Sequence, residues 1–169
     1  MNPLRWSYRR IHLCGFVICA ALLGYALFAQ YHLGLSPCPL CIFQRIGFVV
    51  MGIFFLIGGL HAPRGRSRWI YTGGVLLGAL WGLAWAARHA WLQSLPADQV
   101  PSCGPGLGYM LDAFPMSRVL KMVFTGSGEC AAANWHFLGI TMPVWTFIWF
   151  TVLGAWALCA ALRRPARSP

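Results

Sequence analysis

The sequence predicts an all-α membrane protein, a four-transmembrane-helix bundle that forms one domain over residues 1–169. Hydrophobic residues make up 59% of the chain and charged residues only 9%, whereas a soluble domain carries about 25% charged residues. Four apolar segments each have close to the ~20 residues that a helix needs to cross a bilayer. These predicted spans cover approximately residues 13–31, 42–60, 70–87 and 144–162.

The first span follows Arg5, Arg9 and Arg10, and a basic start of this kind also opens a signal peptide. The apolar run is longer than the roughly 7–15 residues of a typical signal, and no clear small-x-small cleavage site follows it. We therefore expect this segment to be retained as a membrane span.

The basic residues predict the orientation. Nine of the thirteen Lys and Arg residues lie in segments 1–12, 61–69 and 163–169, and all three acidic residues lie in the long loop 88–143. The positive-inside rule then places both termini in the cytoplasm and the loops 32–41 and 88–143 on the opposite side. The net charge of +10 comes from these short clusters, so it does not indicate a nucleic-acid partner.

The long loop is predicted to contain a short amphipathic helix. Pro115 can begin this helix and the sequence TGSG can end it. Its apolar residues recur at helical spacing: Met116, Val119, Leu120, Val123 and Phe124. The helix either lies in the membrane interface or packs on a small core of the loop. Pro143, in MPVW, suits the first turn of the fourth span.

Four of the seven cysteines lie in or beside the two loops on the outer side: Cys38, Cys41, Cys103 and Cys130. Four cysteines allow three pairings. Structural disulfides would suit Cys103 and Cys130, because a bond between distant residues closes a long loop. A bond between Cys38 and Cys41 closes almost no chain. The start of a helix, however, favours the charged thiolate form of a cysteine, and by its position Cys41 would gain more from this effect than Cys38.

The remaining cysteines, Cys14, Cys19 and Cys159, lie in apolar runs, where cysteine behaves as a small hydrophobic residue. A zinc site is the alternative for the loop cysteines, but Cys103 and Cys130 lack the close spacing of a second zinc half-site. We therefore predict no metal site.

Arg45 and His89 are the candidate partners of the cysteine pair. Arg45 follows Cys41 by one helical turn on the same face, and a cation inside a span is usually functional, although it could also extend to the interface. His89 lies just past the third predicted span at a similar depth, where an ordinary interfacial histidine is equally compatible. The sequence has no motif for a soluble nucleotide cofactor, so an electron acceptor would be lipid-soluble.

The whole chain resembles the disulfide-bond formation protein B (DsbB) family of bacterial inner-membrane thiol oxidases. The resemblance rests on an ordered set of features: four spans, CPLC followed by IFQR, one cysteine on each side of the second loop, SGEC, and NWHFLG before MPVW. Gln44 departs from the pattern, because the best-known member has an acidic residue before this arginine.

The resemblance implies a thiol:quinone oxidoreductase in the inner membrane with two periplasmic loops. Its partners would be a DsbA-like periplasmic thiol oxidase, the lipid bilayer and the membrane quinone pool, ubiquinone or menaquinone. Cys103 would receive the partner's thiolate, and Cys130 would be its disulfide partner and then exchange with Cys38. Cys41 would face the quinone, which Arg45 would bind, with His89 as a second contact.

Two other classes of protein remain open from the residues alone. One is a membrane scaffold with two structural disulfides, and the other is a quinone- or haem-binding subunit of an electron-transfer complex. Oxidation of a dedicated partner other than DsbA is a variant of the main hypothesis.

Overall fold

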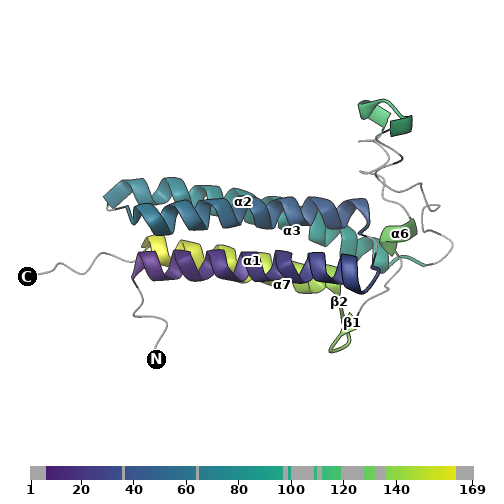
Figure 1. Ribbon diagram of the computed structural model, residues 1–169, viewed down its shortest axis with the longest axis horizontal. Helices are drawn as coiled ribbons and strands as arrows, with labels where there is room; N and C mark the ends of the chain where they lie inside the picture. The colour runs from purple at the N-terminus through teal and green to yellow at the C-terminus, as the bar shows by residue number, and fades with distance from the viewer. Residues whose placement is uncertain are drawn as a thin grey trace, which may run out of the picture.

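The computed structural model describes residues 7–35, 37–63, 65–96, 99, 109, 112–118, 128–131 and 136–162. Four long helices lie side by side in this part of the chain (Figure 1). Each is long and apolar enough to cross a membrane. They are α1 (Tyr8–His32), α2 (Pro39–His61), α3 (Arg68–Gln93) and α7 (Met142–Leu162). The predicted all-α membrane bundle is confirmed.

The helices extend beyond the apolar runs that predicted them, most clearly at α3. This helix continues past Ala87 to Gln93, because its last turns bury Leu92 and His89 inside the protein. The sequence suggested that His89 lies just past the third span, whereas the structure places it within α3. The extension places the His89 imidazole against the bundle instead of in a loop.

The boundaries of α2 follow from local chemistry. Cys38 is the N-cap residue, and its Sγ accepts the Cys41 backbone N–H at 3.4 Å. Pro39 occupies the first helical turn, where its missing N–H costs nothing. At the other end Ala62 adopts a left-handed conformation (φ 43°) and donates its backbone N–H to the Gly58 carbonyl at 3.0 Å. A short 3₁₀ turn, η2 (Gly65–Ser67), leads into α3.

Helix α3 packs against both α2 and α7, whereas α1 packs mainly on α2. Glycines four residues apart on α3 allow this close approach: a Cβ at Gly78 would lie 3.0 Å from the Gly47 carbonyl, and one at Gly82 would overlap the Phe150 ring. Small residues at interfaces are typical of helix packing in membranes. The rings of Phe48 and Phe150 stack with centroids 4.0 Å apart in the central core.

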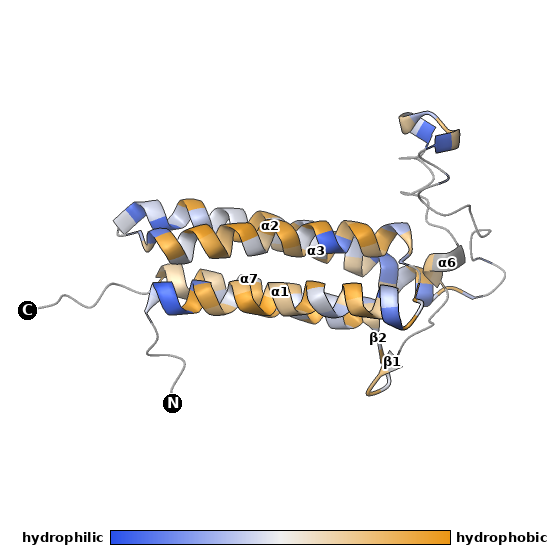
Figure 2. Cartoon of the chain, in the orientation of Figure 1, coloured by the Kyte–Doolittle hydropathy of each residue, from blue (hydrophilic) through white to orange (hydrophobic). Residues whose placement is uncertain are grey.

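Apolar side chains also cover the outside of the bundle, as the orange bands of Figure 2 show. Among the most exposed are Val17, Leu60, Ile70, Leu77 and Leu80, each at least 62% exposed. A soluble monomer rarely exposes so continuous an apolar surface. These residues would contact lipid tails.

The end of the bundle remote from Tyr8 and Leu162 carries further short elements. These are α6 (Gly128–Ala131) and an antiparallel hairpin of β1 (His136–Phe137) and β2 (Ile140–Thr141). Leu138 and Gly139 form the hairpin turn, both with positive φ, as a two-residue type I′ turn requires. The indole N–H of Trp145 donates to the Phe137 carbonyl at 3.1 Å, which ties the hairpin to α7.

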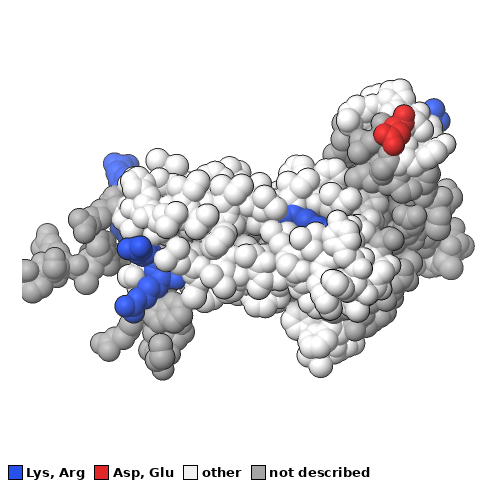
Figure 3. Space-filling view, viewed as in Figure 1, with Lys and Arg blue, Asp and Glu red and all other residues white. Residues whose placement is uncertain are grey.

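Lys and Arg residues gather at the end of the bundle where α1 begins and α7 ends (Figure 3). Of the predicted loop helix, residues 116–118 are helical, and the Arg118 N–H donates to the Pro115 carbonyl at 2.9 Å. Its continuation over 119–127 lies outside the described residues, and so does Cys103.

Candidate functional site

The N-terminus of α2 holds the first two cysteines. The Cys38 and Cys41 sulfurs lie 3.0 Å apart as free thiols. Cys38 is 6% exposed, because it caps the helix with its sulfur turned inward. The Cys-x-x-C spacing with Pro39 at the first helical position thus brings both sulfurs to one side of the helix start, where the dipole favours negative charge.

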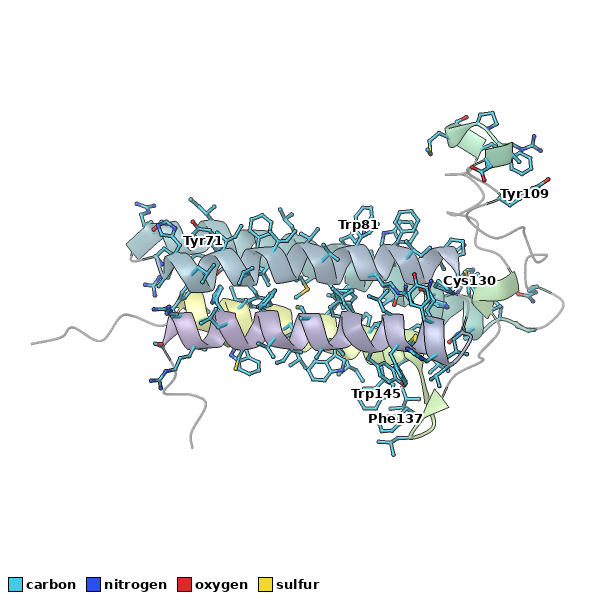
Figure 4. The ribbon with its side chains drawn as sticks, viewed as in Figure 1. Tyr71, Trp81, Tyr109, Cys130, Phe137 and Trp145 are labelled. Carbon is cyan, nitrogen blue, oxygen red and sulfur yellow. The ribbon has the colours of Figure 1, made fainter. Side chains whose placement is uncertain are left out.

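A third cysteine, Cys130, joins this pair from a segment about ninety residues further along the chain. Cys130 lies on α6, which packs on α3 at the end of the bundle (Figure 4), and is 1% exposed. It shares a hydrophobic cluster with Cys38, Leu40, Trp85 and Leu92. Three causes raise the pKa of the Cys38 thiol above its ordinary value. In decreasing order of size, they are the hydrogen bond with Cys130, the hydrogen bond with Cys41, and burial.

His89 reaches the same cluster from α3. Its Nε2 lies 3.9 Å from Cys38 Sγ, and the imidazole is 4% exposed. On the other side of the ring, Gln44 Nε2 lies 3.0 Å from His89 Nδ1. Thr146 of α7 donates its hydroxyl to Gln44 Oε1 at 2.6 Å. The cysteine pair is thus linked through polar contacts to α3 and α7.

Arg45 turns away from this chain of contacts toward α1. Its guanidinium donates to Gln30 Oε1 at 2.6 Å and to the Ala26 carbonyl at 3.1 Å. A guanidinium has five N–H donors, and these two bonds leave three of them without a partner among the described residues. Arg45 is half-buried, so it is held between α1 and α2 and does not extend freely to the interface.

An apolar groove of about 190 Å³ runs between α1 and α2. Residues one and two turns past Arg45 on α2, Val49 and Ile53, line it from one side, and Leu23 and Cys19 of α1 line it from the other. The groove therefore begins about one helical turn further along α2 than Arg45. A cationic donor above an apolar groove suits a ligand with a carbonyl head and a hydrocarbon tail.

The three donor atoms of Cys38, Cys41 and His89 all lie within 4.8 Å of one another. Two thiolates and an imidazole are a donor set that thiophilic ions such as Zn²⁺ accept. The zinc site considered from the sequence comprised cysteines alone and did not include His89.

The structure brings together most of the residues that the sequence singled out. Cys38, Cys41, Cys130 and His89 form one cluster, and Arg45 lies on α2 beside α1. Cys103 lies outside the described residues. The partners Gln30 and Thr146 were not predicted from the sequence, and no contact was predicted for Gln44. The available signal was their polarity within apolar segments.

Comparison with known proteins gives a consistent result. A family model described as "Disulfide bond formation protein DsbB" matches residues 8–160. Three relatives named "Disulfide bond formation protein B" are similar over nearly the whole chain. The protein of Xanthomonas axonopodis pv. citri (strain 306) is 47% identical over 164 residues, covering 96% of this chain and 95% of the relative.

The protein of Acinetobacter baylyi (strain ATCC 33305 / BD413 / ADP1) is 48% identical over 164 residues, covering 95% of each chain. That of Hahella chejuensis (strain KCTC 2396) is 50% identical over 166 residues, covering 96% of this chain and 99% of the relative.

Proposed function

Because this chain belongs to the DsbB family of disulfide bond formation proteins, we propose that it oxidises the dithiol of a periplasmic, thioredoxin-fold partner resembling DsbA and transfers the electrons to a membrane quinone. The family membership establishes a multi-pass membrane protein that acts in disulfide formation. The identity of the partner, the identity of the electron acceptor and the roles of the residues are proposed.

The contact between Cys130 and Cys38 is the observation that carries the proposal. Cys130 belongs to the long loop, and Cys38 belongs to the pair at the start of α2. Thiol–disulfide exchange requires one sulfur to approach another directly. Since these sulfurs interact, a disulfide that involves Cys130 can exchange with Cys38 without a large rearrangement of the helices.

In the proposed series of reactions, the partner's thiolate first attacks Cys103 in a Cys103–Cys130 disulfide. This step releases Cys130 and forms a mixed disulfide between the partner and Cys103. The partner's second thiol then displaces Cys103, so the partner leaves with a disulfide. The reduced Cys103 and Cys130 pass their two electrons on by exchange with a Cys38–Cys41 disulfide. Cys38 takes part in that exchange, and Cys41 is the sulfur from which the electrons leave.

Ubiquinone or menaquinone would supply a lipid-soluble acceptor for the two electrons and two protons that leave the dithiol. Arg45 would hold the carbonyl head, because its guanidinium keeps donors beyond those bonded to Gln30 and Ala26. The groove between α1 and α2 would hold the hydrocarbon tail. His89 would lie beside the reacting sulfurs.

The test is quinone absorbance over time, with purified protein in detergent and a reduced thioredoxin-fold protein as donor. We expect absorbance to fall with the wild type and to stay constant with Cys41→Ser. Cys159→Ser is the matched control, because Cys159 is exposed on α7 and outside the cluster, and it should behave as the wild type. Constant absorbance with the folded wild type and either quinone would sink the proposal.

A further inference from the structure

Two polar side chains that the proposed chemistry does not use, Gln44 and Thr146, connect α7 to His89. Gln44 and His89 are each 4% exposed, so water does not satisfy their polar atoms. Gln44 Nε2 lies 3.0 Å from His89 Nδ1, and Thr146 Oγ1 lies 2.6 Å from Gln44 Oε1. Buried polar groups bonded in series restrict one another's orientation.

The contact with Gln44 determines which nitrogen of His89 carries the proton. A neutral imidazole has one N–H and one bare nitrogen. The amide N–H of Gln44 can donate to Nδ1 only if Nδ1 is bare, which leaves the proton on Nε2. Nε2 is the nitrogen that lies 3.9 Å from Cys38 Sγ and close to Cys41. The Nε2–H therefore faces the sulfurs as a donor.

Thr146 selects the orientation of the Gln44 amide. Its Oγ1 also lies 2.8 Å from the Pro143 carbonyl, and a hydroxyl has a single proton. The 2.6 Å contact with Gln44 is shorter than an amide N–H···O hydrogen bond but ordinary for an O–H···O hydrogen bond, so the hydroxyl donates its proton to Gln44 Oε1. Because Oε1 accepts from Thr146, the amide nitrogen faces His89. A side chain on α7 thus sets the proton position on a ring carried by α3.

We propose that Gln44 and Thr146 are positioning residues that hold His89 in its Nε2–H tautomer, so that His89 donates a hydrogen bond to the thiolate of the cysteine pair. The inference rests on the proposed function and deepens it. A carboxylate at position 44 would have the opposite effect, because it only accepts hydrogen bonds and would draw the proton to Nδ1. The choice of Gln or an acidic residue there determines whether His89 donates to the sulfurs or accepts from them.

The direct test is nitrogen NMR of the reduced protein in detergent, with ¹⁵N in the histidine rings. The chain has five histidines, and the signals lost in His89→Asn identify His89. Correlations between ring nitrogens and ring hydrogens distinguish the two tautomers and the imidazolium. We expect the Nε2–H pattern in the wild type and a proton on Nδ1 in Gln44→Glu. An Nδ1–H pattern in the wild type would overturn the inference.

Variants of Thr146 test whether its hydroxyl orients the Gln44 amide. Thr146→Val removes the hydroxyl and should give a mixture of tautomers, whereas Thr146→Ser keeps the hydroxyl and should keep the wild-type pattern. Thr151→Val is the matched control, because within the described part of the chain the Thr151 hydroxyl bonds only to the Phe147 carbonyl of its own helix. Identical patterns in Thr146→Val and Thr151→Val would refute the role of Thr146.

Turnover provides a second readout. A hydrogen bond to a charged group stabilises it enough to change a rate by about tenfold or more. We expect kcat to fall about tenfold in Thr146→Val and to be retained in Thr146→Ser. The ring signals can be recorded without quinone or partner. If the protein shows the Nε2–H tautomer but does not reduce quinone, the proposed function is refuted and the positioning of His89 is not. Quinone reduction with the opposite tautomer would refute only the positioning role.

Discussion

At the scale of single residues, the protonation of three neighbouring thiols matters most. Cys38 lies between Cys41 and Cys130 and interacts with both. A buried thiol that donates its proton to a neighbouring sulfur is stabilised in its protonated form. Only the thiolate is a nucleophile. The raised pKa of Cys38 therefore favours its unreactive thiol form in the reduced protein.

This arrangement predicts that Cys130→Ala shifts the alkylation of Cys38 to lower pH. The contact with Cys130 is the largest cause of the raised pKa, so its removal lowers the pKa and makes the thiolate available in less alkaline solution. The measurement is the rate of iodoacetamide labelling of Cys38 in reduced protein against pH, read by peptide mass spectrometry. Cys159→Ala should leave the profile unchanged. The same profile with and without Cys130 would contradict this account.

At the scale of elements, glycines on α3 determine how closely the helices approach. Gly74 packs under Phe54 of α2, and Gly82 packs under Phe150 of α7. The two positions are about two turns apart and face different neighbours, so α3 packs closely against both α2 and α7. This packing matters to the site, because α3 carries His89 and supports α6, which carries Cys130.

A methyl group at Gly82 should destabilise the bundle. Its Cβ would overlap the Phe150 ring, and overpacking typically costs about 1–3 kcal/mol. We expect Gly82→Ala to lower the unfolding midpoint, measured by circular dichroism as a denaturing detergent is added.

Gly73→Ala is the matched control on the same helix, since nothing lies within 4 Å of the added Cβ. It should unfold at or slightly above the wild-type midpoint, because alanine favours a helix more than glycine. Equal midpoints for the two variants would show that the close packing at Gly82 does not contribute to stability.

At the scale of the whole molecule, charge and chemistry separate to opposite ends of the bundle. Lys and Arg gather where α1 begins and α7 ends (Figure 3). The cysteine cluster lies at the other end, where α2 begins and α3 ends. Basic segments remain in the cytoplasm, and disulfides form and persist on the outer side. We therefore propose that the termini are cytoplasmic and that the cysteines face the periplasm.

Fusions to alkaline phosphatase, which is active only in the periplasm, test this orientation. A fusion after Leu162 should be inactive, and one after Gln93, at the end of α3, should be active. Green fluorescent protein at the same two positions is the control, because it should give the opposite pattern. Phosphatase activity after Leu162 would reverse the proposed topology.

Much of the fold followed from the sequence, because the bilayer imposes a simple constraint. A segment of about twenty apolar residues must form a helix, since every backbone polar group in lipid has to be bonded within the segment. The CPLC pair, Arg45 and the family resemblance were equally visible in the sequence. The ends of the helices were not, because residues such as His89 extend α3 through packing and not through hydropathy.

Only the tertiary structure decided which side chains meet. Cys130 reaches Cys38 because α6 packs on α3, and Gln44 contacts both His89 and Thr146 because three helices converge there. These contacts join residues 45 to 102 positions apart, and no local pattern encodes them. Hydropathy is a property of a segment, whereas hydrogen bonds between helices depend on how each helix is rotated and packed.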